Sequence, residues 1–437
     1  MEFKEAMDWI QSSEKFGLIL GLDRMKYLMG NLDNPQNKLN IVHIAGTNGK
    51  GSVATYVTTI LEEAGYTVGK YVSPELHSFR DRITIKDELI ESEFITTITE
   101  KIKNISEKMA EELGEQATVF EITTAMAYEY FYEKHVDFAV MEVGLGGRFD
   151  ATNVIDKPKV CAITKIDLDH IAILGDTLEK IAYEKAGIIK NGVPVISSPQ
   201  EEEAFEVIED VAKKNNTTVF QINKKDIASK EWGEDYQKFD YGDFKDLEIS
   251  LLGEHQLENA GTAIEVIKEL IAQGYNISES DIRAGLKNTR WKARLEILSK
   301  NPLILLDGAH NVGGITSLKN ALDKHFSGKK FTFVTGILAD KDFKNMLRML
   351  TPYAKRWITI TPPNPRALEA SKLAEEIRKE TDVEVTALSD AAVSANVLND
   401  MPEDLKAVFN KREEPEYICM FGSLYSADVL RTWVLSL

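Results

Sequence analysis

The feature that most constrains this sequence is a repeated alternation between short apolar runs and longer amphipathic segments. The apolar runs have the length of buried strands, whereas the segments between them place their apolar residues on one face of a helix. Such alternation favours parallel sheets covered by helices and therefore an α/β fold. We expect strands at residues 40–45, 67–71, 137–143, 159–164, 303–307, 331–336 and 417–421.

A break in this pattern falls near residue 298. Before it lies the basic, polar stretch TRWKARLEILSKNP, and after it a new strand, turn and helix begin at LILLDGAHNVGG. We therefore expect a larger domain at residues 1–297 and a smaller one at residues 298–437. The charged stretch at 224–246 interrupts the alternation, and its composition fits either a small antiparallel sheet or a solvated loop.

Composition limits the classes of partner. The chain has 437 residues, enough for two or three domains. Of these residues, 43% are hydrophobic and 28% are charged, as in ordinary globular proteins. The formal net charge of −18 argues against general binding of nucleic acid or of an anionic membrane, but it allows a local basic site for a small anion.

Location follows from three further features of the sequence. The first residues carry charges throughout and lack the core of a signal peptide. No apolar run is long enough to span a bilayer. Cys161 and Cys419 lie in expected strands, so we expect buried free thiols and a cytoplasmic protein.

The stretch HIAGTNGKGSVATYV reads as the end of a strand, a tight turn and the start of a helix. Three glycines around Lys50 let the backbone turn sharply and let its amides approach a ligand. The helix start adds aligned N–H groups with a partial positive charge, and Lys50 adds a full one. The order of these parts predicts a phosphate cradle, although Gly51 separates Lys50 from Ser52 and so alters the usual G-x-x-x-x-G-K-[ST] pattern. The alternative is a glycine-rich turn without a ligand.

GTNGKGS resembles the nucleotide loop of the Mur ligase superfamily, and the details resemble its folate branch, the folylpolyglutamate synthases and dihydrofolate synthases. The resemblance extends over most of the chain and includes EVGLGGRFDATN, ITKIDLDHIAILGDTLEKIAYEKAGIIK and LDGAHNVGG. It implies a Mur-ligase-like P-loop ATPase domain with a parallel-type sheet, followed by a smaller Rossmann-like α/β domain. We expect a monomer with no nucleic-acid or membrane partner.

Members of this family use ATP to join a carboxylate to an amine. The resemblance therefore implies an ATP- and Mg²⁺-dependent acid–amino-acid ligase that adds L-glutamate to a folate through an acyl phosphate. It leaves open whether the protein also converts dihydropteroate to dihydrofolate. Because ATP and the carboxylate are both anions, Mg²⁺, Lys50 and the loop amides must neutralise charge where they meet.

The resemblance also assigns the nucleotide and catalytic residues. It implies that Lys50, Lys185 and His310 are catalytic, with His310 near the γ-phosphate or the incoming amino acid. Asn259 could instead be a polar residue on a helix surface, and Arg294 could form a salt bridge in a linker. The expected ATP-binding residues are Gly46, Thr47, Asn48, Gly49, Lys50, Gly51, Ser52, Asn259, Arg294 and Asp307.

The linker around Arg294 departs from the family pattern. The family more often shows W-P-G-R-L-E where this sequence reads RWKARLE, so Lys292 and Ala293 stand in place of proline and glycine. The arginine is kept, but the rigidity of this segment is open.

For magnesium the resemblance implies Ser73, Glu142 and His170. Each follows an expected strand, and the ends of parallel strands form one edge of a sheet, where such sites occur. Glu142 would be an awkward buried charge without a cation. Ser73 precedes a proline and could merely start a turn, and a hard cation prefers oxygen to the nitrogen of His170.

For the pterin the resemblance implies an early LDR element, a helix start at FEITT and the residues after GLGGR. An aromatic ring beside a carboxylate suits a flat ring with N–H donors. Core packing is the alternative for Phe120. In the loop PELHSFRDRI, Glu75 and Asp81 replace the histidine and glutamate of the family, so substrate preference could differ. The expected folate-binding residues are Leu22, Asp23, Arg24, Phe120, Glu121, Phe149, Asp150 and Ala151.

Lys185 lies in a predicted helix, for which Asp176 with Glu179 would form a capping-box-like start. Leu178, Ile181, Ala182 and Lys185 follow the spacing of one helix face, which is otherwise apolar. Burial there lowers the pKa of a lysine and exposes a neutral amine that can take up CO₂. By resemblance we expect a carbamate on Lys185; the alternative is a lysine whose amine reaches solvent.

Two rival functions follow from the same motifs. A Mur-type peptidoglycan ligase would need an extra N-terminal domain, for which about 40 residues before the glycine loop are too few. A nucleotide-dependent switch without chemistry would have no need of Asp307, His310 or the second domain.

Overall fold

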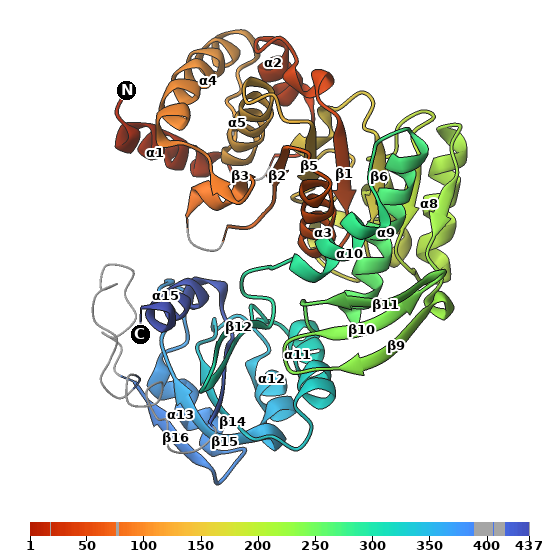
Figure 1. Cartoon of the computed structure of the whole chain (residues 1–437). Helices are drawn as coiled ribbons and strands as arrows, with labels where there is room; N and C mark the ends of the chain where they lie inside the picture. Colours follow the sequence, from red (N-terminus) through yellow and green to blue (C-terminus); the bar gives the residue numbers. More distant parts are fainter. Residues whose placement is uncertain (18, 76–77, 389–404, 406–415, 437) are drawn as a thin grey trace. The chain divides into compact units, whose positions relative to one another are not determined.

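The computed structural model describes residues 1–17, 19–75, 78–388, 405 and 416–436. By compactness the chain forms two units (Figure 1). These units are not continuous in the sequence, because some residues before 290 belong to the second unit. The domain boundary predicted between residues 297 and 298 therefore stays a prediction. The first unit comprises Met1–Ala228, Asp240–Leu247 and Leu257–Thr289, and the second comprises Ser229–Phe239, Glu248–Gln256 and Arg290–Leu437.

The first unit is built on an eight-stranded sheet with the order β4-β3-β2-β5-β1-β6-β7-β8. The strands from β2 to β8 in this order are parallel, and β3 and β4 form an antiparallel edge. The four strands predicted in this region are confirmed as β1, β2, β5 and β6. The strands are Ile41–Ala45 (β1), Val68–Tyr71 (β2), Ile83–Ile85 (β3), Glu88–Leu89 (β4), Phe138–Glu142 (β5), Val160–Ile163 (β6), Val195–Ser197 (β7) and Val219–Gln221 (β8).

Helices cover this sheet. One group packs around a core that includes Ile10, Leu28, Ile98 and Met126, and a second core under α7 and α8 includes Ile181 and Ile208. The helices are Phe3–Ser12 (α1), Asp23–Gly30 (α2), Lys50–Glu63 (α3), Ser92–Leu113 (α4), Val119–Glu133 (α5), Ile171–Leu174 (α6), Leu178–Ala186 (α7), Glu202–Lys214 (α8), His255–Ala272 (α9) and Glu279–Asn288 (α10).

Helices α3 and α10 approach each other closely (Figure 1). A Cβ atom added to Gly285 of α10 would lie 2.5 Å from the Cα atom of Ile60 in α3. Glycine is therefore required at this position, and the contact fixes α3, the helix that the glycine loop opens.

The charged stretch at 224–246 belongs to a three-stranded sheet with the order β11-β10-β9. Of the two structures that the sequence allowed, the small sheet is the one found. Strand β9 keeps its charged side chains exposed, as the composition predicts. The strands are Ile227–Trp232 (β9), Gln237–Tyr241 (β10) and Phe244–Ile249 (β11).

The second unit contains a six-stranded sheet with the order β12-β13-β17-β14-β15-β16, parallel except for β12. Its core is aromatic: the rings of Phe333, Trp357 and Phe421 contact one another. The three strands predicted here are confirmed as β13, β14 and β17. The elements are Glu296–Lys300 (β12), Leu303–Leu306 (β13), Val312–His325 (α11), Phe331–Thr335 (β14), Phe343–Leu350 (α12), Ala354–Thr359 (β15), Ala370–Arg378 (α13), Glu384–Ala387 (β16), Tyr417–Phe421 (β17) and Leu424–Leu435 (α15).

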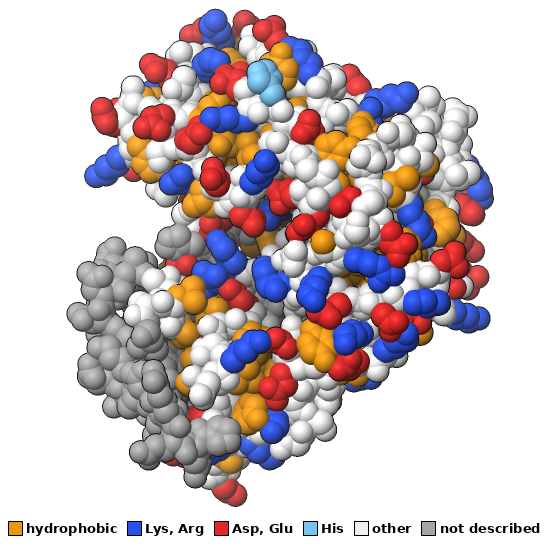
Figure 2. Space-filling view, viewed as in Figure 1, with side chains coloured by type: hydrophobic (Ala, Val, Ile, Leu, Met, Phe, Trp, Pro, Cys, Tyr) orange, Lys and Arg blue, Asp and Glu red, His pale blue; other side chains and the backbone are white. Residues whose placement is uncertain are grey.

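Surface and core agree with the composition. Acidic and basic side chains are interspersed on the face drawn in Figure 2. Cys161 and Cys419 are buried free thiols, as predicted. Among the described residues, no helix has both the length and the apolar content needed to cross a bilayer.

Candidate active site

The glycine loop connects β1 to α3, as the sequence predicts. Gly46 and Gly49 have φ angles of 146° and 90°, in a backbone region that residues other than glycine rarely adopt. A Cβ atom on Gly46 would lie 1.8 Å from Thr164 Oγ1, and one on Gly49 would lie 2.3 Å from Asn259 Oδ1. Asn259, predicted from a distant part of the sequence, thus lies directly against the loop.

Thr47 and Asn48 are held in place by hydrogen bonds to the segment that follows β6. Their backbone amides donate hydrogen bonds to the carbonyl of Lys165, at 3.0 and 3.1 Å. The side chain of Asn48 donates to Asp167 Oδ2 at 2.6 Å, and the hydroxyl of Thr47 donates to the carbonyl of Asp167 at 3.1 Å. The first amides of α3, beginning with Lys50, have no partner within the helix and can serve a phosphate.

The residues Lys165 and Asp167 were missed by sequence reasoning. They lie about 120 residues from the loop, and no local pattern marks a hydrogen bond over that separation.

Lys50 and Lys185 meet at one carbonyl. The Nζ atoms of both side chains donate to the carbonyl of Gly46, Lys50 at 3.0 Å and Lys185 at 2.9 Å. Lys185 is only 4% exposed, which confirms the predicted burial. Burial, together with the charge of Lys50, lowers the pKa of Lys185 to about 7. A neutral amine is thus accessible near neutral pH, as carbamate formation requires; the carbamate itself stays a prediction.

The predicted start of the Lys185 helix needs a correction. Helix α7 is capped by Thr177, whose hydroxyl accepts from the amide of Lys180. Asp176 lies outside the helix and pairs with the Lys180 ammonium at 2.8 Å. Threonine at the cap satisfies an amide of the first turn directly, so the helix begins one residue later.

The strand ends bring two of the three predicted metal ligands together. Glu142 at the end of β5 is 4% exposed, and its carboxylate accepts from the backbone amide of Ser73 at 3.3 Å. A buried carboxylate is an oxygen donor of the kind that Mg²⁺ prefers, and the hydroxyl of the neighbouring Ser73 would be another, so these two residues fit the ion. His170 lies at the start of α6 with an exposed side chain, 3.8 Å from Asp169. Among the described residues, no cluster of three His, Cys, Asp or Glu side chains could hold a metal.

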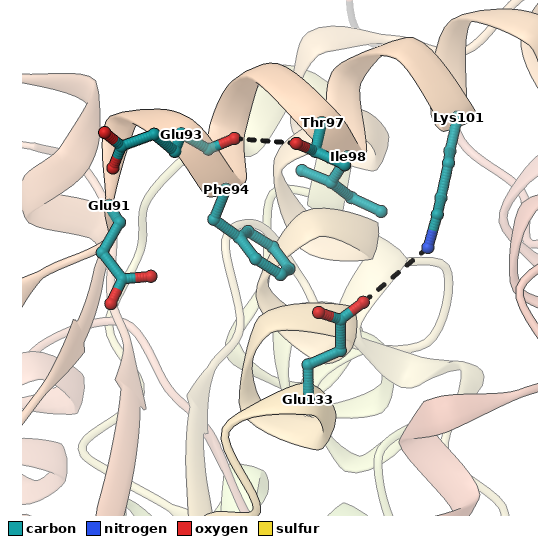
Figure 3. A pocket seen from close by; sticks show the side chains of 7 residues that line it. All are labelled: Glu91, Glu93, Phe94, Thr97, Ile98, Lys101 and Glu133. Atoms are coloured by element: carbon teal, nitrogen blue, oxygen red, sulfur yellow. Dashed lines mark hydrogen bonds and ion pairs between the residues drawn. The ribbon is translucent and has the colours of Figure 1, made fainter.

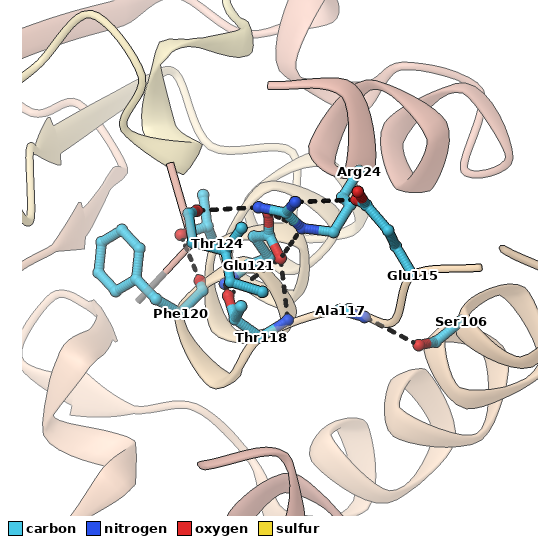
Figure 4. A network of polar contacts seen from close by, with 9 residues as sticks. Arg24, Ser106, Glu115, Ala117, Thr118, Phe120, Glu121 and Thr124 are labelled. Atoms are coloured by element: carbon cyan, nitrogen blue, oxygen red, sulfur yellow. Dashed lines mark hydrogen bonds and ion pairs between the residues drawn. The ribbon is translucent and has the colours of Figure 1, made fainter. Parts of the chain in front are cut away.

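The predicted pterin residues Arg24 and Glu121 bind each other in a buried network (Figure 4). Both are 4% exposed, and Arg24 Nε donates to Glu121 Oε1 at 3.0 Å. Arg24 also donates to Glu115 at 2.9 Å, and Glu121 accepts from the amide of Thr118 at the start of α5. The pair therefore fixes the start of α5 against α2, and Leu22 and the exposed Asp23 begin the latter helix.

The other predicted pterin residues have mixed environments. Phe120 is half-buried with its ring 6.1 Å from that of Tyr71, while Phe149 is 44% exposed. Asp150 and Ala151 are buried at the loop that follows β5. The packing role and the ligand role considered for Phe120 are compatible, because one part of the ring is covered and another is accessible.

In the loop at PELHSFRDRI, the two residues that depart from the family pattern both have partners. Glu75 forms an ion pair with Arg82, whose Nε donates to Glu75 at 2.7 Å. Asp81 accepts from the amide of Ser78 and so caps a short turn. Both substitutions thus have partners within the loop; Leu76 and His77 lie outside the described residues.

A pocket between α4 and the end of α5 lies apart from these residues (Figure 3). Its volume is about 210 Å³. Its Lys101 pairs with Glu133 at 3.7 Å. The lining residues, none of them a predicted site residue, are Glu91, Glu93, Phe94, Thr97, Ile98, Lys101 and Glu133.

Within the second unit, Asp307 organises the segment that carries Arg294. Its carboxylate accepts from the amides of Leu295 and Ala309, at 2.7 and 2.8 Å. Burial raises the pKa of Asp307, and the nearby Arg294 opposes that rise. His310 Nδ1 lies 2.8 Å from the carbonyl of Gly308. Asp307 and His310 thus lie on the segment that follows β13, where a Cβ atom on Gly308 would lie 2.8 Å from Arg294 Nη1.

The altered linker keeps the shape that the family's glycine suggests. Ala293 has a φ angle of 53°, in the left-handed region that favours glycine. Its amide donates to Glu296 at 3.0 Å, and its carbonyl accepts from Gly308 at 2.8 Å. These bonds hold the segment in place without the glycine.

Comparisons with known proteins identify the class. The chain matches the Mur ligase middle domain over residues 44–267 and the Mur ligase glutamate ligase domain over residues 293–412. It is 35% identical to the dihydrofolate synthase/folylpolyglutamate synthase of Bacillus subtilis, with 98% of each chain covered. The solved folylpolyglutamate synthase of Thermotoga maritima has a TM-score of 0.85 at 36% identity, over 99% of this chain and 96% of that one. A solved FPGS–AMPPCP–folate complex has a TM-score of 0.78 at 33% identity, with both chains fully covered.

The fold and the glycine loop are therefore those of an ATP-dependent ligase. The chain belongs to the Mur ligase family, within the branch of the folylpolyglutamate and dihydrofolate synthases.

Proposed function

We propose that the protein adds L-glutamate to a folate, with ATP as the source of energy. The observation that carries the proposal is the glycine loop, where Lys50 and the start of α3 form a cationic cradle beside the buried Glu142 strand end. The full-length similarity to folylpolyglutamate synthases, one of them solved with AMPPCP and folate, supports the same substrates.

In this reaction the acceptor carboxylate attacks the γ-phosphorus of ATP, and ADP leaves. The amine of glutamate then attacks the acyl phosphate, an amide bond forms, and phosphate leaves with the release of a proton. Lys50 and the first amides of α3 would hold the phosphates as negative charge shifts toward ADP. Asn259, Arg294 and Asp307 would bind the nucleotide, and His310 would face the γ-phosphate or the glutamate.

Glu142 and Ser73, with His170, would hold Mg²⁺, which supplies positive charge against the phosphates when bound. Lys185 would act as a carbamate. The set from Leu22 to Ala151 assigned to the pterin would form the folate site. A monomer and a cytoplasmic location are part of the proposal; the two buried thiols of Cys161 and Cys419 support the latter.

Conversion of dihydropteroate to dihydrofolate is a second candidate activity. The observation that favours it is the relative from Bacillus subtilis, whose name carries both activities. The chemistry is the same, because both acceptors present a carboxylate to ATP.

The test is a steady-state assay of ADP release with ATP and Mg²⁺. Release should require both glutamate and a folate, and replacing the folate with dihydropteroate tests the second activity. Release that needs a UDP-linked muramyl acceptor would instead indicate a peptidoglycan ligase. Release that needs neither acceptor nor glutamate would indicate a nucleotide switch.

A further inference from the structure

A buried chain of hydrogen bonds connects β1 to the loop that follows β5. His43, in the middle of β1, is 0% exposed, and its Nε2 atom lies 2.9 Å from Thr152 Oγ1. Thr152 Oγ1 in turn lies 2.6 Å from Asp150 Oδ1. His43 Nδ1 is buried and has no hydrogen-bond partner among the described residues.

The direction of each bond follows from the chemistry at the Asp150 end. Asp150 accepts from the amides of Leu145 and Thr152, at 2.8 and 3.0 Å. Burial raises the pKa of Asp150, and these hydrogen-bond donors oppose that rise. The hydroxyl of Thr152 donates to Asp150 Oδ1, so its oxygen is left to accept from His43.

His43 must therefore carry its proton on Nε2. Burial lowers the pKa of His43 to about 3, so the ring is neutral at physiological pH and has one N–H. With Nε2 as the donor, Nδ1 is the bare acceptor, in agreement with its lack of a partner. An unpartnered buried atom costs free energy, so the ring is not placed here for packing alone.

The far end of this chain shapes a loop that the sequence assigned to the pterin. By accepting from Leu145, Asp150 closes the turn from residue 145 to residue 150, and Phe149 projects from this turn with 44% exposure. Thr152 is also fixed from α5, because the hydroxyl of Tyr128 donates to its carbonyl at 2.6 Å. Helix α5 begins at Val119, next to Phe120 and Glu121.

We propose that His43 is a positioning residue for the folate, acting through Thr152 and Asp150 on the loop at 145–150. The proposal depends on the proposed function, since it takes a pteroate compound as the acceptor. His43 itself touches no reacting group. Its N–H sets the orientation of the threonine hydroxyl, which in turn orients the carboxylate that closes the loop.

The test compares four variants in steady-state assays that vary the folate and ATP separately. Thr152→Val removes the hydroxyl at nearly constant volume, and Thr152→Ser keeps it. His43→Leu removes the N–H, whereas His43→Gln offers an amide N–H in the place of Nε2. We expect Thr152→Val and His43→Leu to raise KM for the folate about tenfold, with KM for ATP changed by less than about twofold, because a buried hydrogen bond is lost on the folate side only. Thr152→Ser and His43→Gln should restore most of the affinity.

Comparing the change in KM for the folate with the change in KM for ATP distinguishes a positioning role from a general distortion of the structure. His43 lies three residues before Gly46, so a distorted β1 would disturb the nucleotide loop and raise both KM values together. Equal changes in both, or a Thr152→Val enzyme with an unchanged folate KM, would overturn the proposal. If His43→Leu does not fold, the valine and serine variants at Thr152 decide alone, with thermal unfolding in the presence of ADP as the check of their nucleotide sites.

Failure of the proposed function is recognised in the wild type. A wild-type enzyme that releases no ADP with folate and glutamate overturns both the function and the positioning role. A wild type active with folate, combined with an unaffected Thr152→Val variant, overturns the positioning role alone.

Discussion

At the scale of single residues, two lysines determine the charge of the glycine loop. Lys50 and Lys185 donate to the same carbonyl of Gly46, so two amines converge on one point of the backbone, and the charge of Lys50 helps to lower the pKa of Lys185 to about 7. Lys50 supplies the positive charge of the loop, which an anionic ligand relieves. The loop is thus suited to a phosphate, and each lysine yields a separate prediction.

Lys50→Ala should reduce kcat by about 100-fold or more while the protein stays folded, because a preorganised charge facing the developing anion is removed. The measurement is ADP release at saturating folate and glutamate, with circular dichroism to check the fold. Lys180→Ala is the matched control, since Lys180 is an exposed lysine that pairs with Asp176 on the surface. A Lys50→Ala enzyme with near wild-type turnover would contradict the assignment of the loop.

Lys185→Ala should be nearly inactive, and short-chain carboxylates should partly restore its activity by replacing the carbamate oxygens. The physical reason is that burial lowers the pKa of Lys185 to about 7. A large fraction of this amine is therefore neutral near neutral pH and able to take up CO₂. The wild type should also lose activity in CO₂-free buffer and regain it when bicarbonate is added. Full activity without CO₂, together with no carbamate in a high-resolution map, would show that Lys185 acts as a plain ammonium.

The lowered pKa of His43 leads us to expect that the free energy of unfolding depends on pH. Its folded pKa, about 3, lies below the ordinary value of 6.5, so between these values the unfolded chain binds the extra proton. The free energy of unfolding should therefore fall as the pH drops below about 6.5, by about 1.4 kcal/mol for each pH unit within the window at most. Urea unfolding of wild type and His43→Gln from about pH 7 to about pH 4 measures this. Equal pH dependence in both proteins would mean that His43 makes no contribution.

At the scale of elements, the parallel strands could be predicted because each is a continuous apolar run bounded by turn residues. The run VMEVG shows the limit, because β5 ends at Glu142 and the strand was expected to continue for one more residue. The same reasoning found Lys185 from its helix spacing but misplaced the cap of α7, since Asp176 and Thr177 are both good cap residues and only packing selects between them.

The polar contacts between distant elements could not be predicted. Arg24 with Glu121, and Asp167 with Asn48, join segments about 100 residues apart, and one sequence contains no signal for such a pair. For the same reason the resemblance could name Arg24 and Glu121 as site residues but not show that they bind each other.

The contact between α3 and α10 gives a prediction at this scale. Gly285→Ala should lower the free energy of unfolding by about 1–3 kcal/mol, because the new methyl group meets the backbone of Ile60 and forces the helices apart. Gly30→Ala is the control, since a Cβ atom there meets no atom within 4 Å. Urea unfolding of the two variants measures the difference. If Gly285→Ala is as stable as Gly30→Ala, the close approach of the helices is wrong.

At the scale of the whole molecule, the chain combines a nucleotide-binding unit with a second α/β unit that carries Asp307 and His310. The residues proposed for the nucleotide are divided between the two units, because Lys50 and Asn259 belong to the first and Arg294 and Asp307 to the second. The acidic net charge of −18 makes the cationic glycine loop a local exception, which suits a small anionic substrate better than a polyanion.

The most direct test of glutamate ligation to a folate is the identity of the product. The protein is incubated with ATP, Mg²⁺, radiolabelled L-glutamate and a reduced folate, and the products are separated by chromatography and weighed by mass spectrometry. We predict label in a folate that has gained one glutamate through an amide bond, with one ADP formed for each glutamate added. Label found only in a UDP-linked muramyl product, or ADP formed without any labelled folate, would contradict it.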